Sequence, residues 1–275
     1  MRAIWTGAVT FGLVNVPVKL YSATEDHDIK LNMVHGEDGG RIRYERRCEK
    51  CNKKVAWEDI AKAYNDGERT VVLTDEDLAS LPAERDREIE VVQFVPTDQI
   101  DPIVFGRSYY LEPDSKSPKA YLLLRETLKR TNLTAVTSFA LRNKTRLGAL
   151  RVKDEVLVLQ SMLWADEVRE ADFPVTRSRA KISDSELKMS AALVDQFSSD
   201  FTPEAFTDEY QEELGRLIEA KLEQGDAVGT EDTFGPRAEE EGEDAEVVDL
   251  MEALKRSIAQ RKESKSAGKA GKKGA

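Results

Sequence analysis

The fold is decided by residues 135–163, which read AVTSFALRNKTRLGALRVKDEVLVLQSML. This stretch holds three short apolar segments, at 135–141, 147–152 and 156–163, each of a length and composition typical of a β-strand. Turn sequences such as Glu-Asp-Gly-Gly at 37–40 separate many of the further segments of this kind. This density of short strands predicts a mainly β fold, either a barrel or a pair of packed sheets. The further segments lie at 8–18, 41–46, 70–73, 88–96 and 108–111.

The apolar stretch 3–18 is a strand, a tight turn and a strand closed by Pro17, because Thr6, Thr10 and Asn15 interrupt it too often for a secretory signal. The chain has 275 residues, of which 40% are apolar and 34% charged, as expected for a globular protein with some disordered sequence. No apolar run approaches the roughly 20 residues of a membrane helix. Two cysteines are too few for a disulfide framework, so we expect a cytoplasmic protein.

Helical patterns interrupt the strands and then replace them. Thr74 is a predicted cap for a helix over 75–81, and residues 120–130 have helical spacing. After Pro174 two amphipathic helices are expected. The first begins with the capping-box pair Ser183 and Glu186. The second begins at Thr202 and Pro203 and ends at Gly225, and its stripe contains Phe206, Tyr210, Leu214, Leu217, Ile218 and Leu222. These stripes pack either on the β body or in a dimer, and the pattern alone leaves both open.

Charge is segregated along the chain, although the net charge is −11. Residues 115–153 carry ten basic residues and one acidic residue, and residues 41–54 carry seven and two. Residues 58–101 carry thirteen acidic and four basic residues. A concentrated basic zone on an acidic protein favours a polyanion bound on one face, whereas a mixed solvated surface is the plainer explanation.

Alternation of the basic residues favours the polyanion. Arg142, Lys144 and Arg146 fall on one face of an extended segment, and Arg41 and Arg43 do the same. Cations on one strand face repel one another unless an anion neutralises them. The sequence therefore predicts a nucleic-acid-binding surface. Its candidate residues are Arg41, Arg43, Lys116, Lys119, Arg125, Lys129, Arg130, Arg142, Lys144, Arg146 and Arg151.

The last fifty residues form three further predicted segments. Residues 226–245 are an acidic linker expected to be disordered. Residues 246–262 contain a short amphipathic helix, which is typical of a docking peptide for another protein. Residues 263–275 are a Lys-rich disordered tail, suited to phosphate contact. The docking residues are Val247, Leu250, Met251, Leu254 and Ile258, and the tail lysines are Lys265, Lys269, Lys272 and Lys273.

Signatures of catalysis are absent from the sequence. His27 and His35 are the only histidines, and no P-loop, dinucleotide fingerprint or metalloprotease motif is present. We therefore expect no catalytic residues and no cofactor. Cys48 and Cys51 are half of a tetrahedral zinc site, and the chain has no second cysteine pair, so two reduced thiols are expected. The alternative is a structural zinc whose ligand set is completed by a histidine or by a second subunit.

Several motifs resemble the prokaryotic Ku proteins, the DNA-end-binding factors of bacterial non-homologous end joining. The opening Arg2-Ala-Ile-Trp-Thr-Gly with Phe11-Gly-Leu-Val-Asn-Val-Pro-Val carries the resemblance first. It continues through RIRY at 41–44, SYYLEPD at 108–114, LRNKTR at 141–146 and ALRVK at 149–153. ELKM at 186–189 and YQE at 210–212 extend it into the helical part, so it covers about residues 1–225.

The resemblance implies a Ku-core β-barrel with a DNA-encircling bridge at 1–175, in which residues 108–129 lie in or beside the bridge. It implies a helical arm at 176–225 that closes a homodimer through Phe206, Tyr210, Leu214 and Leu217. The resemblance further implies that the dimer forms a ring that threads onto ends of linear double-stranded DNA at double-strand breaks. It also implies recruitment and stimulation of a multifunctional ATP-dependent end-joining ligase, for which residues 246–262 are the expected docking segment, by a cytoplasmic, nucleoid-associated protein without catalytic activity.

Two other functions remain open on the sequence. One is a lyase that acts at abasic DNA ends, with a lysine amine as the Schiff-base nucleophile. The other is a zinc-bearing RNA-binding module built around Cys48 and Cys51.

Overall fold

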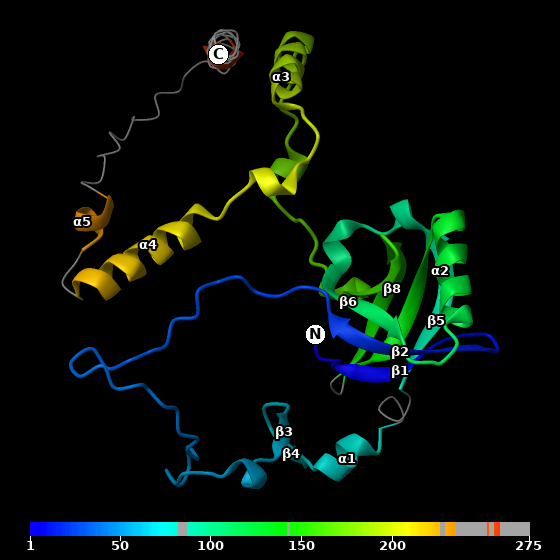
Figure 1. Ribbon diagram of the computed structural model, residues 1–275, viewed down its shortest axis with the longest axis vertical. Helices are drawn as coiled ribbons and strands as arrows, with labels where there is room; N and C mark the ends of the chain where they lie inside the picture. The colour runs from blue at the N-terminus through cyan, green and yellow to red at the C-terminus, as the bar shows by residue number, and fades with distance from the viewer. Residues whose placement is uncertain (82–86, 142–143, 226–228, 235–251, 253–255, 259–275) are drawn as a thin grey trace. The chain divides into compact units, whose positions relative to one another are not determined.

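Seven strands close into a barrel in the computed structural model of the chain (Figure 1). The structure describes residues 1–81, 87–141, 144–225, 229–234, 252 and 256–258. These divide into two units. The first contains Met1–His27 and Leu31–Glu170, and the second contains Asp28–Lys30 and the described residues from Ala171 onward.

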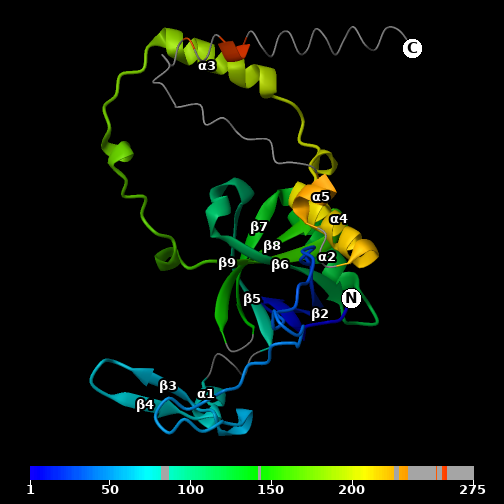
Figure 2. The same cartoon turned by 90° about the vertical axis from the view of Figure 1, so that its left-hand side faces the viewer.

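The barrel has the strand order β1-β2-β6-β9-β8-β7-β5 and closes through a parallel pairing of β1 with β5. Every other neighbouring pair is antiparallel. Figure 2 shows the barrel after a quarter turn, with β2, β5, β6, β7, β8 and β9 labelled. The strands are β1 (Trp5–Phe11), β2 (Val14–Ser22), β5 (Glu88–Pro96), β6 (Phe105–Pro113), β7 (Leu133–Ala140), β8 (Thr145–Lys153) and β9 (Val156–Met162).

Alternate residues of each strand fill the barrel, as the two-residue period of a strand requires. On β8, Leu150 is fully buried, and a side-chain carbon added to Gly148 would lie 2.8 Å from Leu159 Cδ1. Arg146 is two residues before Gly148 and therefore shares its inward register. The inward face of β8 thus runs from an apolar centre to a charged residue at the start of the strand.

Helix α2 (Lys119–Thr131) covers one end of the barrel, where β6 and β8 end and β7 and β9 begin. Tyr121, Leu124 and Leu128 of α2 are buried in the barrel core. The Tyr121 hydroxyl donates to the Leu111 carbonyl at 2.8 Å and accepts from the Leu157 amide at 2.9 Å. The helix therefore closes this end both by apolar burial and by capping two edge groups of the barrel.

A long excursion, residues 23–87, joins β2 to β5 outside the barrel. Among its described residues, none from 24 to 81 is buried. Its ordered elements are η1 (Trp57–Asp59), the hairpin β3 (Lys62–Asn65) and β4 (Thr70–Leu73), and α1 (Asp75–Ala79). The excursion therefore has no hydrophobic core of its own, and an isolated two-stranded hairpin is marginal in water.

The second unit is helical. It contains α3 (Asp184–Phe197), α4 (Glu209–Gln224) and α5 (Thr230–Phe234), with the 3-10 turns η6 (Pro174–Arg177) and η7 (Pro203–Ala205). No residue of α3 or α4 is buried. In the part of the chain that the structure describes, no helix has the length and apolarity needed to cross a membrane.

The mainly β fold with helices is confirmed, and the barrel is the correct one of the two expected architectures. The strands predicted at 70–73 and 88–96 have the predicted bounds, and Ser183 and Glu186 form the predicted capping box of α3. Strands β1, β2 and β8 extend beyond the predicted bounds, and β7 begins two residues earlier than predicted, because ladder pairing continues past the apolar positions.

Four local predictions were wrong. Residues 230–234, predicted to lie in a disordered linker, form the short helix α5. Residues 41–46 form no strand, because only an isolated bridge between Val34 and Arg41 provides a partner. Pro17 does not end the second strand, since β2 continues to Ser22 and Pro17 pairs opposite Ala8. The second helix predicted after Pro174 does not start at Thr202, because α4 begins after Asp208, whose side chain accepts from the Gln211 amide.

Candidate nucleic-acid interface

Two of the predicted DNA-binding cations, Arg125 and Lys129 on α2, are neutralised within the chain. Lys129 Nζ lies 2.8 Å from a carboxylate oxygen of Glu155, and Arg125 Nη1 lies 3.1 Å from the other. Arg125 also pairs with Glu126 at 2.8 Å and is largely buried. The hydrogen bond to Glu155 raises the pKa of Lys129, and that to Glu126 raises the pKa of Arg125. These two cations fix α2 to the β8–β9 turn and are poorly placed to bind phosphate.

Three neighbouring cations are exposed and form no ion pair with the described residues. Lys116 lies in the turn after β6, Lys119 begins α2, and Arg130 lies in its last turn. Exposed and unpaired cations can contact phosphate without first breaking an internal bond. At this end of the barrel, Lys116, Lys119 and Arg130 are therefore the better candidates.

Three further described cations of the basic zone, Lys144, Arg146 and Arg151, lie on β8 or directly before it. Arg151 is half-buried and donates to the Gln160 side chain at 3.2 Å. Arg146, the second residue of β8, has the inward register, and Lys144 is exposed directly before the strand. The prediction that Lys144 and Arg146 share one strand face was wrong, because β8 begins only at Thr145.

The barrel divides the basic zone between its two ends. β8 has nine residues, so its ends lie roughly 26 Å apart at about 3.3 Å per residue. Arg130 belongs to the end that α2 covers, whereas Lys144 and Arg146 belong to the opposite end. This separation is less than one turn of duplex DNA, about 34 Å, so one duplex could contact both ends.

The open end of the barrel contains a cavity of about 760 Å³ that the sequence did not reveal. Its lining includes Arg107 on β6 together with Lys144 and Arg146. The sequence does not single out Arg107, because it is a single cation outside any alternating pattern. The pairing of β9 with both β6 and β8 brings these two strands to the same mouth, on either side of β9.

Arg41 and Arg43 lie in the excursion, and both are exposed. The Arg41 guanidinium donates to the Asn32 side chain at 2.8 Å. Residues 108–129 build most of β6 and α2, which pack into the barrel, and their expected position in or beside the bridge stays a prediction. The excursion leaves the barrel after β2 and returns to it at β5.

Several predicted residues lie outside the part of the chain that the structure describes. These are Arg142, the tail lysines Lys265, Lys269, Lys272 and Lys273, and the docking residues Val247, Leu250, Met251 and Leu254. The docking residue Ile258 is described and is partly exposed.

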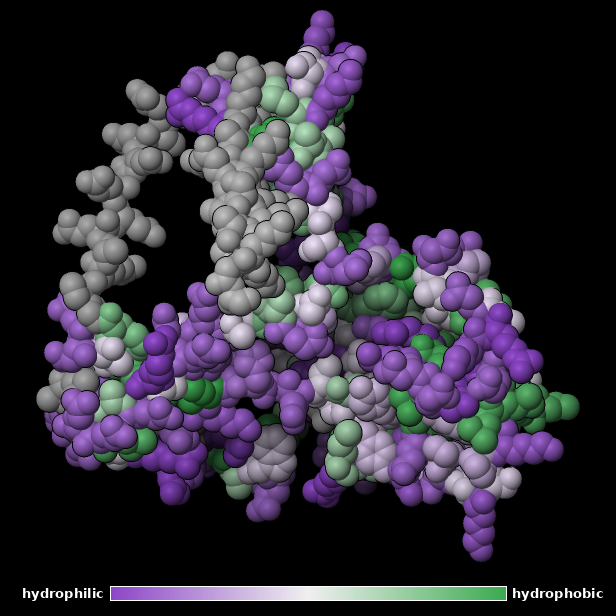
Figure 3. All heavy atoms as spheres, turned by 45° about the horizontal axis from the view of Figure 1, so that its top comes forward, coloured by the Kyte–Doolittle hydropathy of each residue, from purple (hydrophilic) through white to green (hydrophobic). Residues whose placement is uncertain are grey.

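The residues predicted for dimer closure form an exposed apolar surface on the second unit. Phe206 and Tyr210 are 72% and 67% exposed, and Leu214 and Leu217 on α4 are half-buried. Phe206 precedes α4 and stacks against Phe201, with ring centroids 5.9 Å apart. Figure 3 shows a largely hydrophilic face in which hydrophobic side chains appear between the polar ones. Exposed aromatic residues at this density are typical of a surface that a partner covers.

Cys48 and Cys51 lie in a tight hairpin in the excursion. The Cys48 amide donates to the Lys53 carbonyl at 2.9 Å, and Asn52 adopts a left-handed conformation with φ of 54°. Hydrogen bonds from Cys51 and Lys50 lower the pKa of the Cys48 thiol. No histidine or carboxylate in the described part of the chain joins the two thiols as a third metal ligand. Both cysteines are free, and zinc binding stays an untested prediction.

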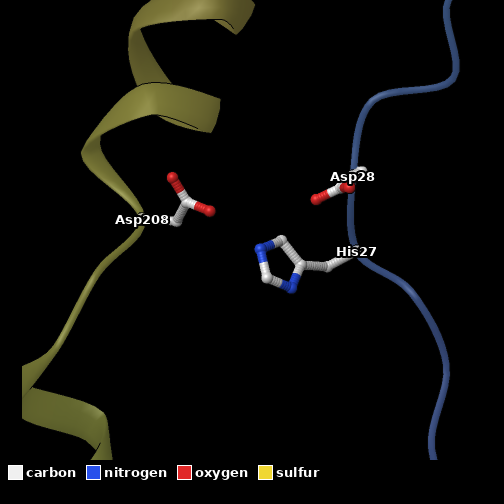
Figure 4. A group of neighbouring side chains, drawn as sticks. All are labelled: His27, Asp28 and Asp208. Carbon is white, nitrogen blue, oxygen red and sulfur yellow. The ribbon is translucent and has the colours of Figure 1, made fainter. Parts of the chain in front are cut away.

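Figure 4 draws Asp28 and Asp208, two exposed carboxylates of the second unit. The Gln211 side chain holds the segment around Asp28, since its amide donates to Asp28 at 3.3 Å and its carbonyl accepts from the Ile29 amide at 3.0 Å. These bonds explain why residues 28–30 group with the helices rather than with the barrel. Two exposed carboxylates by themselves do not constitute a metal site.

Comparison with known proteins agrees with this architecture. Residues 10–189 match the family model described as Ku, the Ku70/Ku80 beta-barrel domain. A protein of Leifsonia xyli named "Non-homologous end joining protein Ku" is 62% identical over 270 residues, which cover 98% of this chain and 90% of that protein. A Mycobacterium tuberculosis protein of the same name is 52% identical over 97% of this chain and 98% of its own length.

A Bacillus subtilis protein of the same name is more distant, at 40% identity over 94% of this chain and 82% of its own length. The similarity therefore extends well beyond the barrel into the helical unit. With the closed seven-stranded barrel, the family-model match and relatives at this identity, the chain belongs to the Ku family of non-homologous end joining proteins.

Proposed function

We propose that this protein binds the ends of linear double-stranded DNA at double-strand breaks, as a homodimeric ring, in non-homologous end joining. The proposal adds that it has no catalytic activity and that it recruits and stimulates the ATP-dependent end-joining ligase. Membership of the Ku family and the name of its relatives support the pathway. The exposed, unpaired cations at both ends of the barrel support binding to the phosphate backbone without base contacts.

The observation that carries the ring proposal is the excursion of residues 23–87. It leaves the barrel after β2 and returns beside β1, where the Ala8 amide donates to the Arg87 carbonyl at 3.1 Å. Its contour length is roughly 200 Å at about 3.3 Å per residue, which is ample to pass over a duplex. Because none of its described residues from 24 to 81 is buried, it requires an outside surface to order against.

The proposed dimer and the proposed ligase contact involve different parts of the chain. The exposed apolar residues of the second unit, including Phe206 and Tyr210, support a second copy of the chain as the covering surface. An obligate interface of this kind buries on the order of 2,000 Å² or more. Residues 246–262 are the proposed ligase-docking segment, and the protein is proposed to be cytoplasmic and nucleoid-associated.

Neither alternative function gains an observation from the structure. A Schiff-base lysine needs a lowered pKa, but Asp114 raises the pKa of Lys19 and Glu155 raises that of Lys129. The zinc-bearing RNA-binding module needs further ligands beside Cys48 and Cys51, and the described residues offer none.

The test of the proposed function is binding to one plasmid in two forms, linearised and covalently closed, at matched moderate salt. Ring threading predicts retention on the linear form alone. It also predicts that bound protein escapes when the ends are free and stays when both ends are blocked after loading. Equal retention on both forms would identify a general nucleic-acid binder and refute the ring.

The ligase-docking proposal has a separate test. Deletion of residues 246–262 should leave end binding intact and abolish stimulation of ligation by the cognate ligase. Stimulation that survives the deletion would place the docking surface elsewhere in the chain.

A further inference from the structure

The barrel has one covered end and one open end. Helix α2 fills the end at which β9 begins, whereas the end at which β9 stops contains the cavity of about 760 Å³. The cavity is lined by residues that start or finish strands and by the segment after β9. They include Ile4, Ser22, Gly106, Leu141, Thr145, Met162 and Leu163. A cavity of this volume is typical of a small-molecule site.

Three cations converge on this cavity. Arg107, Lys144 and Arg146 line it, and none of them forms an ion pair with the described residues. This differs from the α2 end, where Arg125 and Lys129 are both paired with carboxylates. Like charges at one cavity are unfavourable unless an anion neutralises them, so the mouth is built to accept a negatively charged group.

The innermost cation is incompletely satisfied. Arg146 has the inward register of Gly148 and Leu150, and its Nε atom is buried without a hydrogen-bond partner in the described part of the chain. A buried donor that lacks a partner costs about 1–3 kcal/mol. An oxyanion that enters the cavity would supply the missing acceptor. The partner of this guanidinium is therefore expected to be a ligand.

Aromatic and hydroxyl groups complete the lining. Tyr109 is buried at the wall of the cavity, and Trp164, which follows β9, lines it while 39% exposed. Ser161 donates to the Arg107 carbonyl at 3.2 Å, which ties the strand that carries Arg107 to β9. A half-exposed indole beside cations is suited to bind a nucleotide, because the base can stack on the indole ring while a guanidinium binds the phosphate.

The acid in the lining, Glu167, has a structural partner. Its carboxylate accepts from the Trp164 amide at 2.8 Å and so fixes the turn that presents the indole. Gly106 is also restricted, because a side-chain carbon there would lie 2.7 Å from Ser161 Oγ. A larger residue at position 106 would therefore displace the Ser161 side chain in the wall of the cavity.

We propose that the open mouth of the barrel is a nucleotide pocket, in which Arg107, Lys144 and Arg146 bind a phosphate and Trp164 stacks on the base. The proposal rests on the proposed function for its source of nucleotide, an unpaired nucleotide at the end of the bound DNA. A free mononucleotide has the same chemistry and is the other source. The pocket gives the protein a means to sense whether an end is frayed or overhanging, in addition to its contacts with the duplex backbone.

The test uses the full chain and two probes. The first is a duplex with a three-nucleotide overhang that carries 2-aminopurine at its terminal position, compared with a blunt duplex that carries the same base in its terminal pair. The second is free deoxyadenosine 5′-monophosphate, titrated calorimetrically. The variants are Arg107→Gln and Trp164→Leu. Arg169→Gln is the matched control, because it removes the same charge from an exposed residue outside the cavity.

Wild-type protein is expected to quench the overhanging 2-aminopurine and to prefer the overhang duplex over the blunt duplex. Loss of a stacked base or its phosphate contact should reduce that preference about tenfold in Trp164→Leu and Arg107→Gln, and leave it unchanged in Arg169→Gln. Binding of the blunt duplex should stay within about twofold in Trp164→Leu, because that residue is uncharged.

Each result assigns or rejects the pocket. Quenching that both variants abolish supports a strand-end nucleotide, whereas calorimetric binding of the mononucleotide without quenching supports the free nucleotide. The pocket is overturned if neither quenching nor calorimetric binding is observed. It is also overturned if Arg169→Gln loses the preference for the overhang duplex as much as the two pocket variants do. Failure of the proposed function is distinguishable, because it shows as equal retention on linear and closed plasmid by the wild-type protein.

Discussion

Replacement of Tyr121 by phenylalanine tests how the barrel is closed by α2. The hydroxyl is buried and connects two strands, since it donates to the Leu111 carbonyl on β6 and accepts from the Leu157 amide on β9. Tyr121→Phe removes both hydrogen bonds and keeps the ring that packs in the core. At about 1 kcal/mol for each net hydrogen bond, the loss is about 2 kcal/mol. The buried Leu157 amide is left without its partner, which adds to the cost.

The free energy of unfolding can be measured by urea denaturation followed by circular dichroism. The expected result is a lower midpoint with an unchanged slope for Tyr121→Phe. Tyr64→Phe is the matched control, because Tyr64 is 66% exposed on the excursion, and its effect should stay within about 0.5 kcal/mol. A Tyr121→Phe variant as stable as this control would falsify the view that α2 caps the strands through its hydroxyl.

Three further predictions follow from the described contacts. Lys129 and Arg125 hold the pKa of Glu155 below its usual value, so the stabilisation from this carboxylate is present above about pH 4.5 and is lost as the pH falls through the lowered pKa. The difference in unfolding free energy between wild type and Glu155→Gln should therefore shrink on acidification, as measured from denaturation midpoints at several pH values. Gly148→Ala places a carbon 2.7 Å from Thr137 Oγ1 in the filled barrel, so it should destabilise the protein by about 1–3 kcal/mol, and an unchanged melting temperature would contradict the close packing. Arg130→Gln should reduce the slope of log affinity against log salt by about 0.9, and an unaltered slope would exclude a phosphate contact there.

Local sequence was sufficient to determine most of the individual elements. Short segments rich in β-forming residues, with flanking turn residues, located β4 and β5, and the capping box of Ser183 and Glu186 located the start of α3. These signals depend on residues within a few positions of one another, so they can be identified without the fold. The same signals failed at residues 41–46, where a strand-like sequence lacks a neighbour to pair with. Strand identity depends on a partner, and the partner is not encoded locally.

The basic surface could be predicted in composition but not in arrangement. The sequence identifies residues 115–153 as a basic zone, yet it cannot show that Arg125 and Lys129 are neutralised by Glu155. Ion pairing depends on side chains that tertiary packing brings together, in this case from α2 and the β8–β9 turn. The sequence also gave Arg107 no distinction, because one arginine among neutral residues produces no charge pattern.

By itself, then, the sequence determined the mainly β class, the helices that follow it, the segregation of charge and the resemblance to the Ku proteins. Tertiary structure decided which cations are available to a ligand, which end of the barrel is open, and how residues 108–129 pack into the barrel as β6 and α2. The physical reason is that periodicity and capping are short-range properties of the chain. Barrel closure instead joins strands distant in sequence, such as β1 to β5 and β6 to β9, and only that closure creates a cavity and fixes the partners of each charge.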